Sequence, residues 1–394
     1  SEDLPAMQWK DIYSSDQEHY GAKLGSLENH PDGKYVIKIE ATDNGENVTN
    51  ELISFVIDNT APEINIFKPA EGEVYSAHNG NVVFEGDIVE DNIEQYTVEY
   101  GYGDNPQEWT AITLEGNLPV DAVLAEWNVE SVSDGEYTIR VTALDKVGHK
   151  KEAYTHLTVD NTPPSIEVSS IVDGGYINGA TEIIGTVADN NFKSYEISVA
   201  TGNKGSSERW TLIGNGEAEV TEGVLWNWGL LPVDGVYTLK INALDLAENS
   251  TEKLIELTVD TVPLEAVTEL TASAEKSGDL GDVTLSWSSI ISDELAGYAV
   301  YRNGIRINDV IEESNEFVDF GLPQGEYNYQ VSSVDKAGNE SELSDSRLIT
   351  VDFMPPSVEI HTPSADSVIS GQINIRGTAK GSNDFKNYQV FLGE

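Results

Sequence analysis

Aspartate and asparagine residues recur at three separated positions in successive segments of this 394-residue chain: a linker before proline, an early loop and a late loop. Carboxylate and amide oxygens are the ligands that hard cations prefer, and Ca²⁺ takes about six to eight of them. Wherever three such positions meet, the sequence predicts a structural Ca²⁺ site. The predicted ligands are Asp58, Asn59, Asp91, Asn92 and Asp145; then Asp160, Asn161, Asp189, Asn190 and Asp245; and then Asp352, Asp384 and, from another copy, Asp43.

These positions can converge only if strands carry them to one end of a β-sandwich. In a seven-strand sandwich the strands alternate in direction, so the early and late loops both lie beside the entering linker. In a third, less regular version of the pattern, the three positions are Asp260, Asp293 and Asp335. The alternative interpretation is that these residues are ordinary turn formers in solvated loops.

A repeat of about one hundred residues organises the chain. Asp-Gly-x-Tyr is followed by a late-loop aspartate and then by Val-Asp-Asn-Thr-Pro-Pro or a close variant. Tyr35, Tyr137 and Tyr237 are 102 and 100 residues apart, and Tyr327 follows after 90. A period of this length is one small domain, much longer than a solenoid turn.

The segments between these signatures have the pattern of β-strands. Residues 137–144 alternate large apolar with polar side chains, as a half-buried strand requires, and residues 36–39 and 236–241 do the same. No segment long enough to form a helix has the apolar stripe of an amphipathic helix. The repeated tyrosine that opens the penultimate strand is typical of a tyrosine corner. We therefore predict an all-β chain, a tandem array of Greek-key sandwiches.

The Asp-Gly-x-Tyr to Val-Asp-Asn-Thr-Pro-Pro pattern resembles the bacterial immunoglobulin-like repeats of large secreted and cell-surface, adhesin-type proteins. Residues 263–354 instead resemble a fibronectin type III module, through Val283-Thr284-Leu285-Ser286-Trp287, Gly297–Arg302 and Tyr327. The resemblance implies immunoglobulin-like (Ig-like) sandwiches and an extracellular location. It also implies Ca²⁺ at domain junctions, as in giant adhesins of this type.

Signature spacing predicts that one Ig-like domain is divided between the two ends of the chain. Pro62 lies 72 residues before Asp134, and Pro164 lies 70 before Asp234. Joining Glu394 to Ser1 gives 70 residues again between Pro356 and Asp32. The predicted domains are 1–60 (the C-terminal half of an Ig-like domain), 61–162 and 163–262 (Ig-like), 263–354 (fibronectin-like), and 355–394 (the N-terminal half).

Half a sandwich leaves strand edges and an apolar face uncovered. Three explanations stay open: the chain is one period of a longer repetitive protein, its halves complete those of neighbouring copies by strand complementation, or they close within one molecule. The first two give a head-to-tail contact that does not close, which is the geometry of a filament.

Composition excludes several classes of function. Asp and Glu number 69 against 22 Lys and Arg, for a formal net charge of −47, so nucleic acid and anionic lipid would be repelled. There is no cysteine, and no apolar run approaches the roughly 18–20 residues of a membrane span. The six histidines are scattered without metal-ligand spacing, and no nucleophile or phosphate-loop motif occurs.

We therefore expect a non-catalytic structural segment of an extracellular filament, stalk or adhesin, with adjacent repeats or copies of itself as partners and surface glycans as possible ligands. The alternative is a set of accessory spacer or carbohydrate-binding modules of a large secreted hydrolase. Exposed tryptophans could stack on sugars, although core or interface packing is the commoner role for Trp109, Trp127, Trp210 and Trp228.

Overall fold

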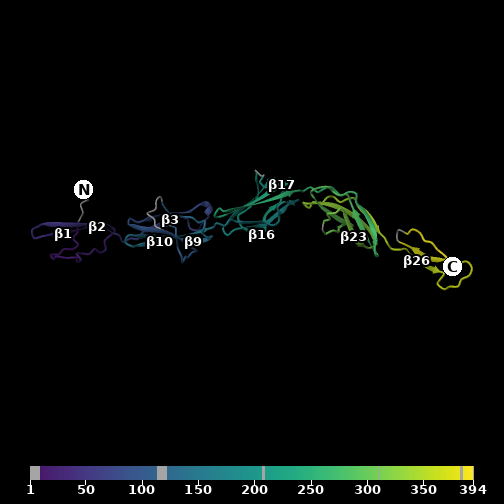
Figure 1. Cartoon of the computed structure of the whole chain (residues 1–394), viewed down its shortest axis with the longest axis horizontal. Helices are drawn as coiled ribbons and strands as arrows, with labels where there is room; N and C mark the ends of the chain where they lie inside the picture. Colours follow the sequence, from purple (N-terminus) through teal and green to yellow (C-terminus); the bar gives the residue numbers. More distant parts are fainter. Residues whose placement is uncertain (1–8, 113–121, 206–208, 310, 382–384, 394) are drawn as a thin grey trace. The chain divides into compact units, whose positions relative to one another are not determined.

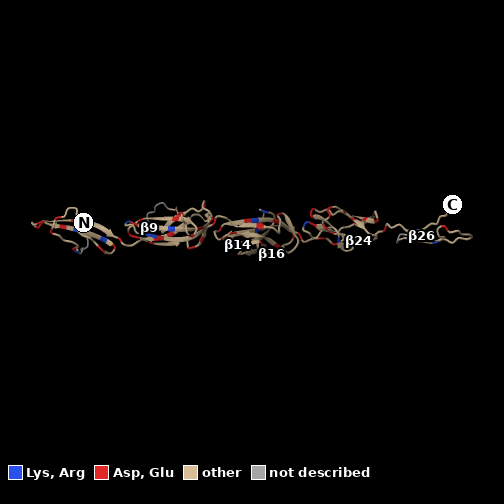
Figure 2. Cartoon of the chain, turned by 90° about the horizontal axis from the view of Figure 1, so that it is seen from below, with Lys and Arg blue, Asp and Glu red and all other residues tan. Residues whose placement is uncertain are grey.

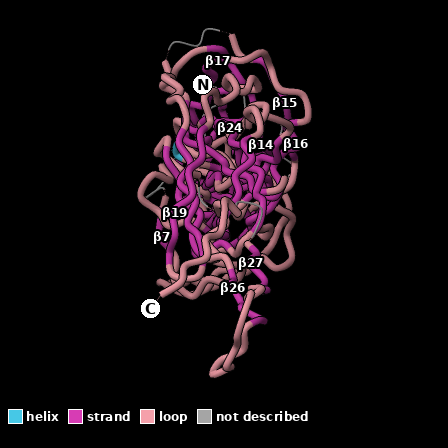
Figure 3. Tube along the Cα trace, turned by 90° about the vertical axis from the view of Figure 1, so that its right-hand side faces the viewer, coloured by secondary structure: helices cyan, strands magenta, loops and turns pink. Residues whose placement is uncertain are grey.

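The computed structural model describes residues 9–112, 122–205, 209–309, 311–381 and 385–393 (Figure 1). Strands dominate these residues, and the one short helix among them is the 3₁₀ turn η1 (Ala77–Asn79) (Figure 3). The predicted all-β class is therefore confirmed. None of the helical structure in the described ranges has the length and apolarity that a membrane crossing requires.

The chain forms two compact units, which are described separately. Unit 1 comprises Ser1–Pro164, Asp189–Lys193 and Leu244–Ser250, and unit 2 comprises Ser165–Ala188, Ser194–Ala243 and Thr251–Glu394. The five predicted domain ranges stay predictions, because strand order alone does not locate a domain boundary.

Within unit 1, eight strands form the first complete repeat. They are β3 (Glu63–Lys68), β4 (Glu73–Tyr75), β5 (Val82–Val89), β6 (Ile93–Tyr102), β7 (Thr110–Ala111), β8 (Val123–Trp127), β9 (Gly135–Asp145) and β10 (Lys150–Val159). One sheet has the order β4-β10-β9-β6-β7 and the other β3-β5-β8. Both sheets contribute to one hydrophobic core, so the repeat is a β-sandwich.

Strand β9 shows how the sequence builds this core. Tyr137, Ile139, Val141 and Ala143 are at most 5% exposed, whereas the alternate residue Arg140 is only half-buried. Because side chains alternate across a strand, this pattern puts an apolar stripe on the inner face.

The second complete repeat has the same strand order. Its strands are β11 (Ser165–Val168), β12 (Gly175–Ile177), β13 (Thr181–Ala188), β14 (Phe192–Thr201), β15 (Thr211–Gly216), β16 (Val220–Trp228), β17 (Gly235–Asp245) and β18 (Ser250–Val259). They form the sheets β12-β18-β17-β14-β15 and β11-β13-β16.

The fibronectin-like module lies in unit 2. Its strands are β19 (Thr271–Ser277), β20 (Leu280–Ser286), β21 (Leu295–Arg302), β22 (Ile305–Arg306), β23 (Glu316–Leu322), β24 (Gly325–Asp335) and β25 (Arg347–Val351). Sheets of order β19-β20-β23 and β22-β21-β24-β25 share a core that includes Trp287 and Tyr329. Three strands facing four is the arrangement expected of this kind of sandwich.

The repeated tyrosine makes the same contact in every copy. The hydroxyl of Tyr137 donates to the carbonyl of Ser133 at 2.7 Å, four residues earlier. Tyr35, Tyr237 and Tyr327 donate to Pro31, Val233 and Pro323 in the same way. The tyrosine corner predicted from the sequence is confirmed, and it fixes the turn that opens the penultimate strand.

Two isolated hairpins occupy the ends of the described chain. Strands β1 (Gly33–Thr42) and β2 (Val48–Ile57) form one two-stranded sheet, and β26 (Ser357–Thr362) and β27 (Arg376–Lys380) form another. Apolar residues on both are exposed, for example Ile39 (47%) and Ile360 (68%). In the complete repeats the corresponding strands belong to larger sheets.

Acidic residues are spread over both units and greatly outnumber basic ones (Figure 2). Few of the 69 carboxylates can therefore have a cationic neighbour. The candidate sites below are places where acidic side chains from separated loops lie close together and at least one of them is buried.

Candidate cation-binding junctions

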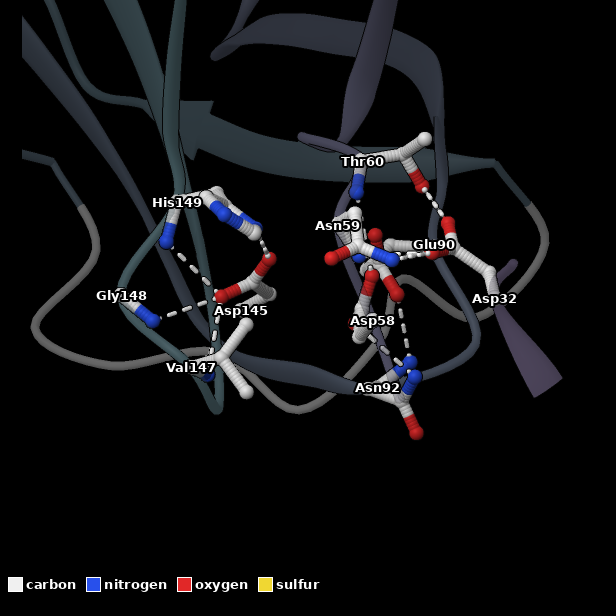
Figure 4. Close-up of polar contacts among 10 residues, drawn as sticks. All are labelled: Asp32, Asp58, Asn59, Thr60, Glu90, Asn92, Asp145, Val147, Gly148 and His149. Atoms are coloured by element: carbon white, nitrogen blue, oxygen red, sulfur yellow. Dashed lines mark hydrogen bonds and ion pairs between the residues drawn. The ribbon is translucent and has the colours of Figure 1, made fainter. Parts of the chain in front are cut away.

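The first junction gathers Asp58, Asp145 and His149, which each offer one ligand atom within 4.8 Å of the others. Asp58 begins the linker after β2, whereas Asp145 and His149 flank the turn between β9 and β10 (Figure 4). The sequence predicted the two aspartates, whereas His149 was not among the predicted ligands.

Backbone donors fix the carboxylate of Asp145. Its Oδ1 accepts from the N–H groups of Val147, Gly148 and His149 at 2.7–2.9 Å, and its Oδ2 lies 2.8 Å from Nδ1 of His149 (Figure 4). Burial opposes ionisation, yet these hydrogen bonds hold the pKa of Asp145 below its usual range. The hydrogen bond to Asp145 in turn raises the pKa of His149.

The early loop is fixed by an asparagine. Asn92 donates its side-chain amide to Oδ2 of Asp58 at 2.9 Å, and its backbone N–H donates to Oε1 of Glu90 at 2.6 Å. Asp91, which lies between them, is exposed. The acidic residue turned toward the asparagine backbone is thus Glu90, one position before the predicted one.

The second junction has three carboxylates and no histidine. Asp160, Asp189 and Asp245 each place an oxygen within 4.8 Å of the others, and Asp160 and Asp245 are 3% and 0% exposed. Burial raises the pKa of Asp189 and of Asp245, and the neighbouring carboxylates raise both further. Negative charge here is therefore poorly compensated by the residues around it.

Two asparagines frame this second cluster. Asn191 donates to Oδ2 of Asp160 at 2.7 Å, as Asn92 does to Asp58. Asn249 donates its side-chain amide to Oδ2 of Asp245 at 2.7 Å and to the main-chain carbonyl of Asp160 at 2.8 Å. The remaining carboxylate oxygens of the cluster are oxygen donors suited to a hard cation.

The third junction differs in its early loop. Asn339 repeats the role of Asn249, donating to Oδ2 of Asp335 and to the carbonyl of Asp260, both at 2.9 Å. The backbone N–H of Lys336 donates to the carbonyl of Glu294, as Lys146 does to Asn92, so Glu294 takes the place of the early-loop asparagine. Oδ2 of Asp260 is buried and has no hydrogen-bond partner among the described residues. The exposed predicted residue Asp293 precedes this position by one.

Several other predicted ligands lie elsewhere. Asn59 and Asn161 donate to Asp32 and Asp134 of the Asp-Gly turns rather than facing the clusters. Asn190 is exposed, like its counterpart Asp91. Asp43 forms the same turn as Asp145 with Asn47 but is exposed, Asp352 is half-buried, and Asp384 lies outside the described residues.

The residue four positions after each late-loop aspartate was missed from the sequence. It is Asn47, His149, Asn249 or Asn339, and in each case its side chain contacts that aspartate. Its repetition at constant spacing was a signal that the sequence did contain.

Cations cover the repeated tryptophans. The guanidinium of Arg140 and the ammonium of Lys240 each lie 4.1 Å from the ring centroids of Trp109 and Trp210, and Lys38 lies 5.1 Å from that of Trp9. Trp127 and Trp228 are 5% and 3% exposed. These rings therefore serve packing and cation–π contacts, which leaves them poorly placed to stack on sugars.

Comparison with known proteins supports the Ig-like assignment. Residues 24–100 and 122–208 match the family described as bacterial Ig-like domain (group 3). Together with the strand orders above, this confirms the predicted resemblance to bacterial immunoglobulin-like repeats over those two stretches. No curated protein matches the chain.

Similar solved structures are also tandem modules. The Clostridium thermocellum CbhA fibronectin(III)-like modules are 16% identical, with 50% of this chain and 94% of that chain covered and a TM-score of 0.30. Chicken CNTN1 FN1–FN3 domains are 17% identical, with coverages of 74% and 98% and a TM-score of 0.34. A tetra-tandem repeat in the extending region of a large adhesion protein is 15% identical, with coverages of 82% and 82% and a TM-score of 0.28.

Proposed function

We propose that this chain is a non-catalytic structural segment of a bacterial extracellular or cell-surface protein, in which Ig-like and fibronectin-like modules act as spacers. The observation that carries this proposal is the repeated junction: a linker aspartate, a late-loop aspartate and an amide that bonds both. Such a contact restricts the freedom of the linker, which suits a stalk, adhesin or filament. The family match and the acidic surface support the same function.

The second junction is the place where the chain would hold Ca²⁺. Three carboxylates from three separated loops each place an oxygen within 4.8 Å of the others, close enough to share one ion, two of them are buried, and two have raised pKa values. A bound divalent cation would remove the repulsion among them and brace the loops against the linker.

The first junction fits Ca²⁺ less well. Its third group is the imidazole of His149, a nitrogen ligand, and its Asp145 carboxylate already accepts four hydrogen bonds. Hard cations prefer oxygen, so we expect Ca²⁺ to stabilise the second junction more than the first.

Calorimetry of the intact chain with Ca²⁺ and with chelator tests this proposal. Wild type should unfold at higher temperature with Ca²⁺. Asp189→Asn removes one repelling carboxylate, so it should raise the unfolding temperature in chelator and reduce the gain from Ca²⁺. Asp91→Asn, an exposed change at the first junction, is the matched control. Identical wild-type unfolding under both conditions would contradict Ca²⁺ binding.

We further propose that the segments join head to tail through their terminal hairpins, either between copies or between adjacent repeats of one longer polypeptide. Exposed apolar side chains on β1, β2, β26 and β27 support this, because water-exposed strand faces of this kind favour association. Sedimentation over a range of concentrations and electron microscopy test the joining. Growth into linear assemblies is expected, and a strict monomer at all concentrations would argue against it.

A further inference from the structure

The N-terminal hairpin has the geometry of the last two strands of a complete repeat. Tyr35 pairs with Phe55 across β1 and β2, just as Tyr137 pairs with Leu157 across β9 and β10. In the complete repeat β9 also pairs with β6 along its other edge, and β10 with β4. Both outer edges of the N-terminal hairpin therefore lack a paired strand among the described residues, whereas the corresponding edges of the complete repeat are paired.

The C-terminal hairpin has the geometry of the first strands of a repeat. Ile360 pairs with Gly377 across β26 and β27, as Ile66 pairs with Gly86 across β3 and β5. A Cβ placed on Gly377 would lie 2.3 Å from the carbonyl oxygen of Glu359, and one on Gly86 would lie 2.3 Å from that of Asn65. The same backbone approach demands glycine at both positions.

The segment that follows β27 matches a strand in sequence but lies outside any strand in the structure. Within residues 385–393, Tyr388, Val390 and Leu392 repeat the spacing of Tyr96, Val98 and Tyr100 on β6. The three C-terminal side chains are 65%, 59% and 95% exposed. Their β6 counterparts Tyr96 and Val98 are 5% and 0% exposed, and Tyr100 packs against the core.

We infer that residues 385–393 of one copy add to the free edge of β1 of a second copy as an antiparallel strand, in one register. The inference rests on the proposed head-to-tail joining and specifies its contacts. In the complete repeat Tyr96, Val98 and Tyr100 pair with Ala143, Val141 and Ile139. Transfer of this register pairs Tyr388 with Ala41, Val390 with Ile39 and Leu392 with Ile37.

The free edge of β2 receives a second, shorter strand. In the complete repeat β4 pairs in parallel with β10, with Val74 opposite Thr158 and Tyr75 opposite Val159. The matching C-terminal residues are Val368 and Ile369, which are 100% and 49% exposed. They lie opposite Val56 and Ile57 of the second copy. Strands on both sides of the hairpin rebuild the sheet order of a complete repeat, by strand addition.

The residues on the outward face of the proposed strand pair also correspond to residue pairs in the complete repeat. In the complete repeat Glu99 pairs with Arg140, their side chains 2.7 Å apart, while Thr97 pairs with Thr142. The transferred register puts Phe391 opposite Lys38 and Gln389 opposite Glu40. These four outward positions can be substituted without entering the core.

The absence of natural cysteine allows a direct test of the register. Two variants with one cysteine each are mixed and oxidised. Because no chain carries two cysteines, any disulfide must join two copies. Glu40→Cys with Gln389→Cys, and Lys38→Cys with Phe391→Cys, should cross-link efficiently because directly opposed residues lie within disulfide reach. The diagonal combinations, Lys38→Cys with Gln389→Cys and Glu40→Cys with Phe391→Cys, should cross-link at least about tenfold more slowly, since diagonal neighbours are roughly 7–8 Å apart.

A second pair of variants tests, without cross-linking, whether Val390 is buried in the joined sheet and Phe391 faces outward. Val390→Lys should weaken association about a hundredfold or more, since it would bury an unpaired charge in the new sheet. Phe391→Glu should preserve association, because it sets a carboxylate across from Lys38 as in the complete repeat. Both positions are exposed in the single chain, so neither change should unfold the modules.

The outcomes distinguish a wrong register from a failure of the proposed head-to-tail joining. Association with equal cross-linking of matched and diagonal pairs overturns the register and leaves the joining intact. Absence of association at all concentrations overturns both. In a chain that carries both Glu40→Cys and Gln389→Cys, a disulfide within the chain, with none between the singly substituted chains, shows closure inside one molecule and overturns the choice of a second copy.

Discussion

The side-chain amide of Asn249 donates to the main-chain carbonyl of Asp160 at 2.8 Å while also donating to the carboxylate of Asp245 at 2.7 Å. One amide therefore joins the linker that enters a repeat to the late loop of that repeat. Asn339 repeats the contact with Asp260 and Asp335. At the first junction His149 stands in this place and contacts Asp145.

Removal of this amide should loosen the second junction. Asn249→Ala deletes both hydrogen bonds beside a buried carboxylate, so we expect a loss of about 1–3 kcal/mol in the free energy of unfolding of that repeat. Asn249→His should retain part of the stability, because imidazole also reaches the aspartate in the first junction. Thermal unfolding of both variants measures the effect, and Ser250→Ala, an exposed neighbour, is the control. Equal stability of all four proteins would contradict the role of the amide.

The fibronectin-like module contains a hydrogen-bonded triad around the buried carboxylate of Asp319. Asp319 accepts from the hydroxyl of Tyr329 at 2.7 Å and from Nη1 of Arg302 at 2.7 and 2.9 Å. Asp319→Asn leaves the guanidinium without its counter-charge, and we expect a loss of about 2–4 kcal/mol. Calorimetry of the intact chain measures the effect as the downward shift of one unfolding transition, and the transitions of the other modules serve as internal references.

A matched control for the triad is Asp282→Asn. Asp282 accepts the backbone N–H of Gly321 at an exposed position. A smaller loss is expected there, of about 1 kcal/mol or less. If both variants were equally stable, the triad would not contribute to the stability of the core.

Glu71 makes the first complete repeat sensitive to acid. The backbone N–H of His156, together with its ring, holds the pKa of Glu71 below its usual range. A carboxyl with a depressed folded-state pKa stabilises the fold above its unfolded pKa, and this contribution is lost as pH falls through the lower folded value. Because the site is exposed, we expect at most about 1 kcal/mol.

The comparison of wild type with Glu71→Gln checks this dependence. The variant should be less stable at pH 7, and the difference should vanish at pH values below the depressed pKa of Glu71. A difference in unfolding temperature that stays constant through the acid range would rule out the titration of Glu71 as its cause.

A glycine sets the approach of two strands in the second complete repeat. A Cβ on Gly185 would lie 2.0 Å from the carbonyl oxygen of Glu167, so Gly185→Ala should separate β11 from β13 and cost about 1–3 kcal/mol. Gly179→Ala is the control, since its Cβ would meet nothing within 4 Å. Calorimetry should show a lower unfolding temperature for Gly185→Ala only, and equal effects would contradict the packing argument.

The sequence predicted the fold better than the site. Alternation along residues 137–144 and the constant spacing of Tyr35, Tyr137 and Tyr237 are local features, and they identify strands and the tyrosine corner directly. The convergence of Asp160, Asp189 and Asp245 was also predicted, because strand alternation puts those loops at one end of a sandwich.

Finer placement could not be predicted, because it depends on turn geometry. Side chains in tight turns alternate in direction, so a shift of one residue exchanges a facing group for an exposed one. This explains why Asn191 faces the linker aspartate Asp160, and Glu90 the backbone of Asn92, while the predicted Asp91 and Asn190 are exposed. Asn59 and Asn161 were misplaced because their side-chain amides turn away from the clusters, that of Asn59 to the carboxylate of Asp32 and that of Asn161 to the carbonyl of Val129.

The parallel pairing of β4 with β10 has a mechanical consequence. These strands lie near opposite ends of the first complete repeat in sequence, so tension on the chain pulls them along their length in opposite directions. All of the hydrogen bonds between them then bear the load together, in shear, rather than opening one after another like a zipper. Breaking several hydrogen bonds at once needs a larger force than breaking them in turn, so this pairing would let the proposed stalk, adhesin or filament carry tension.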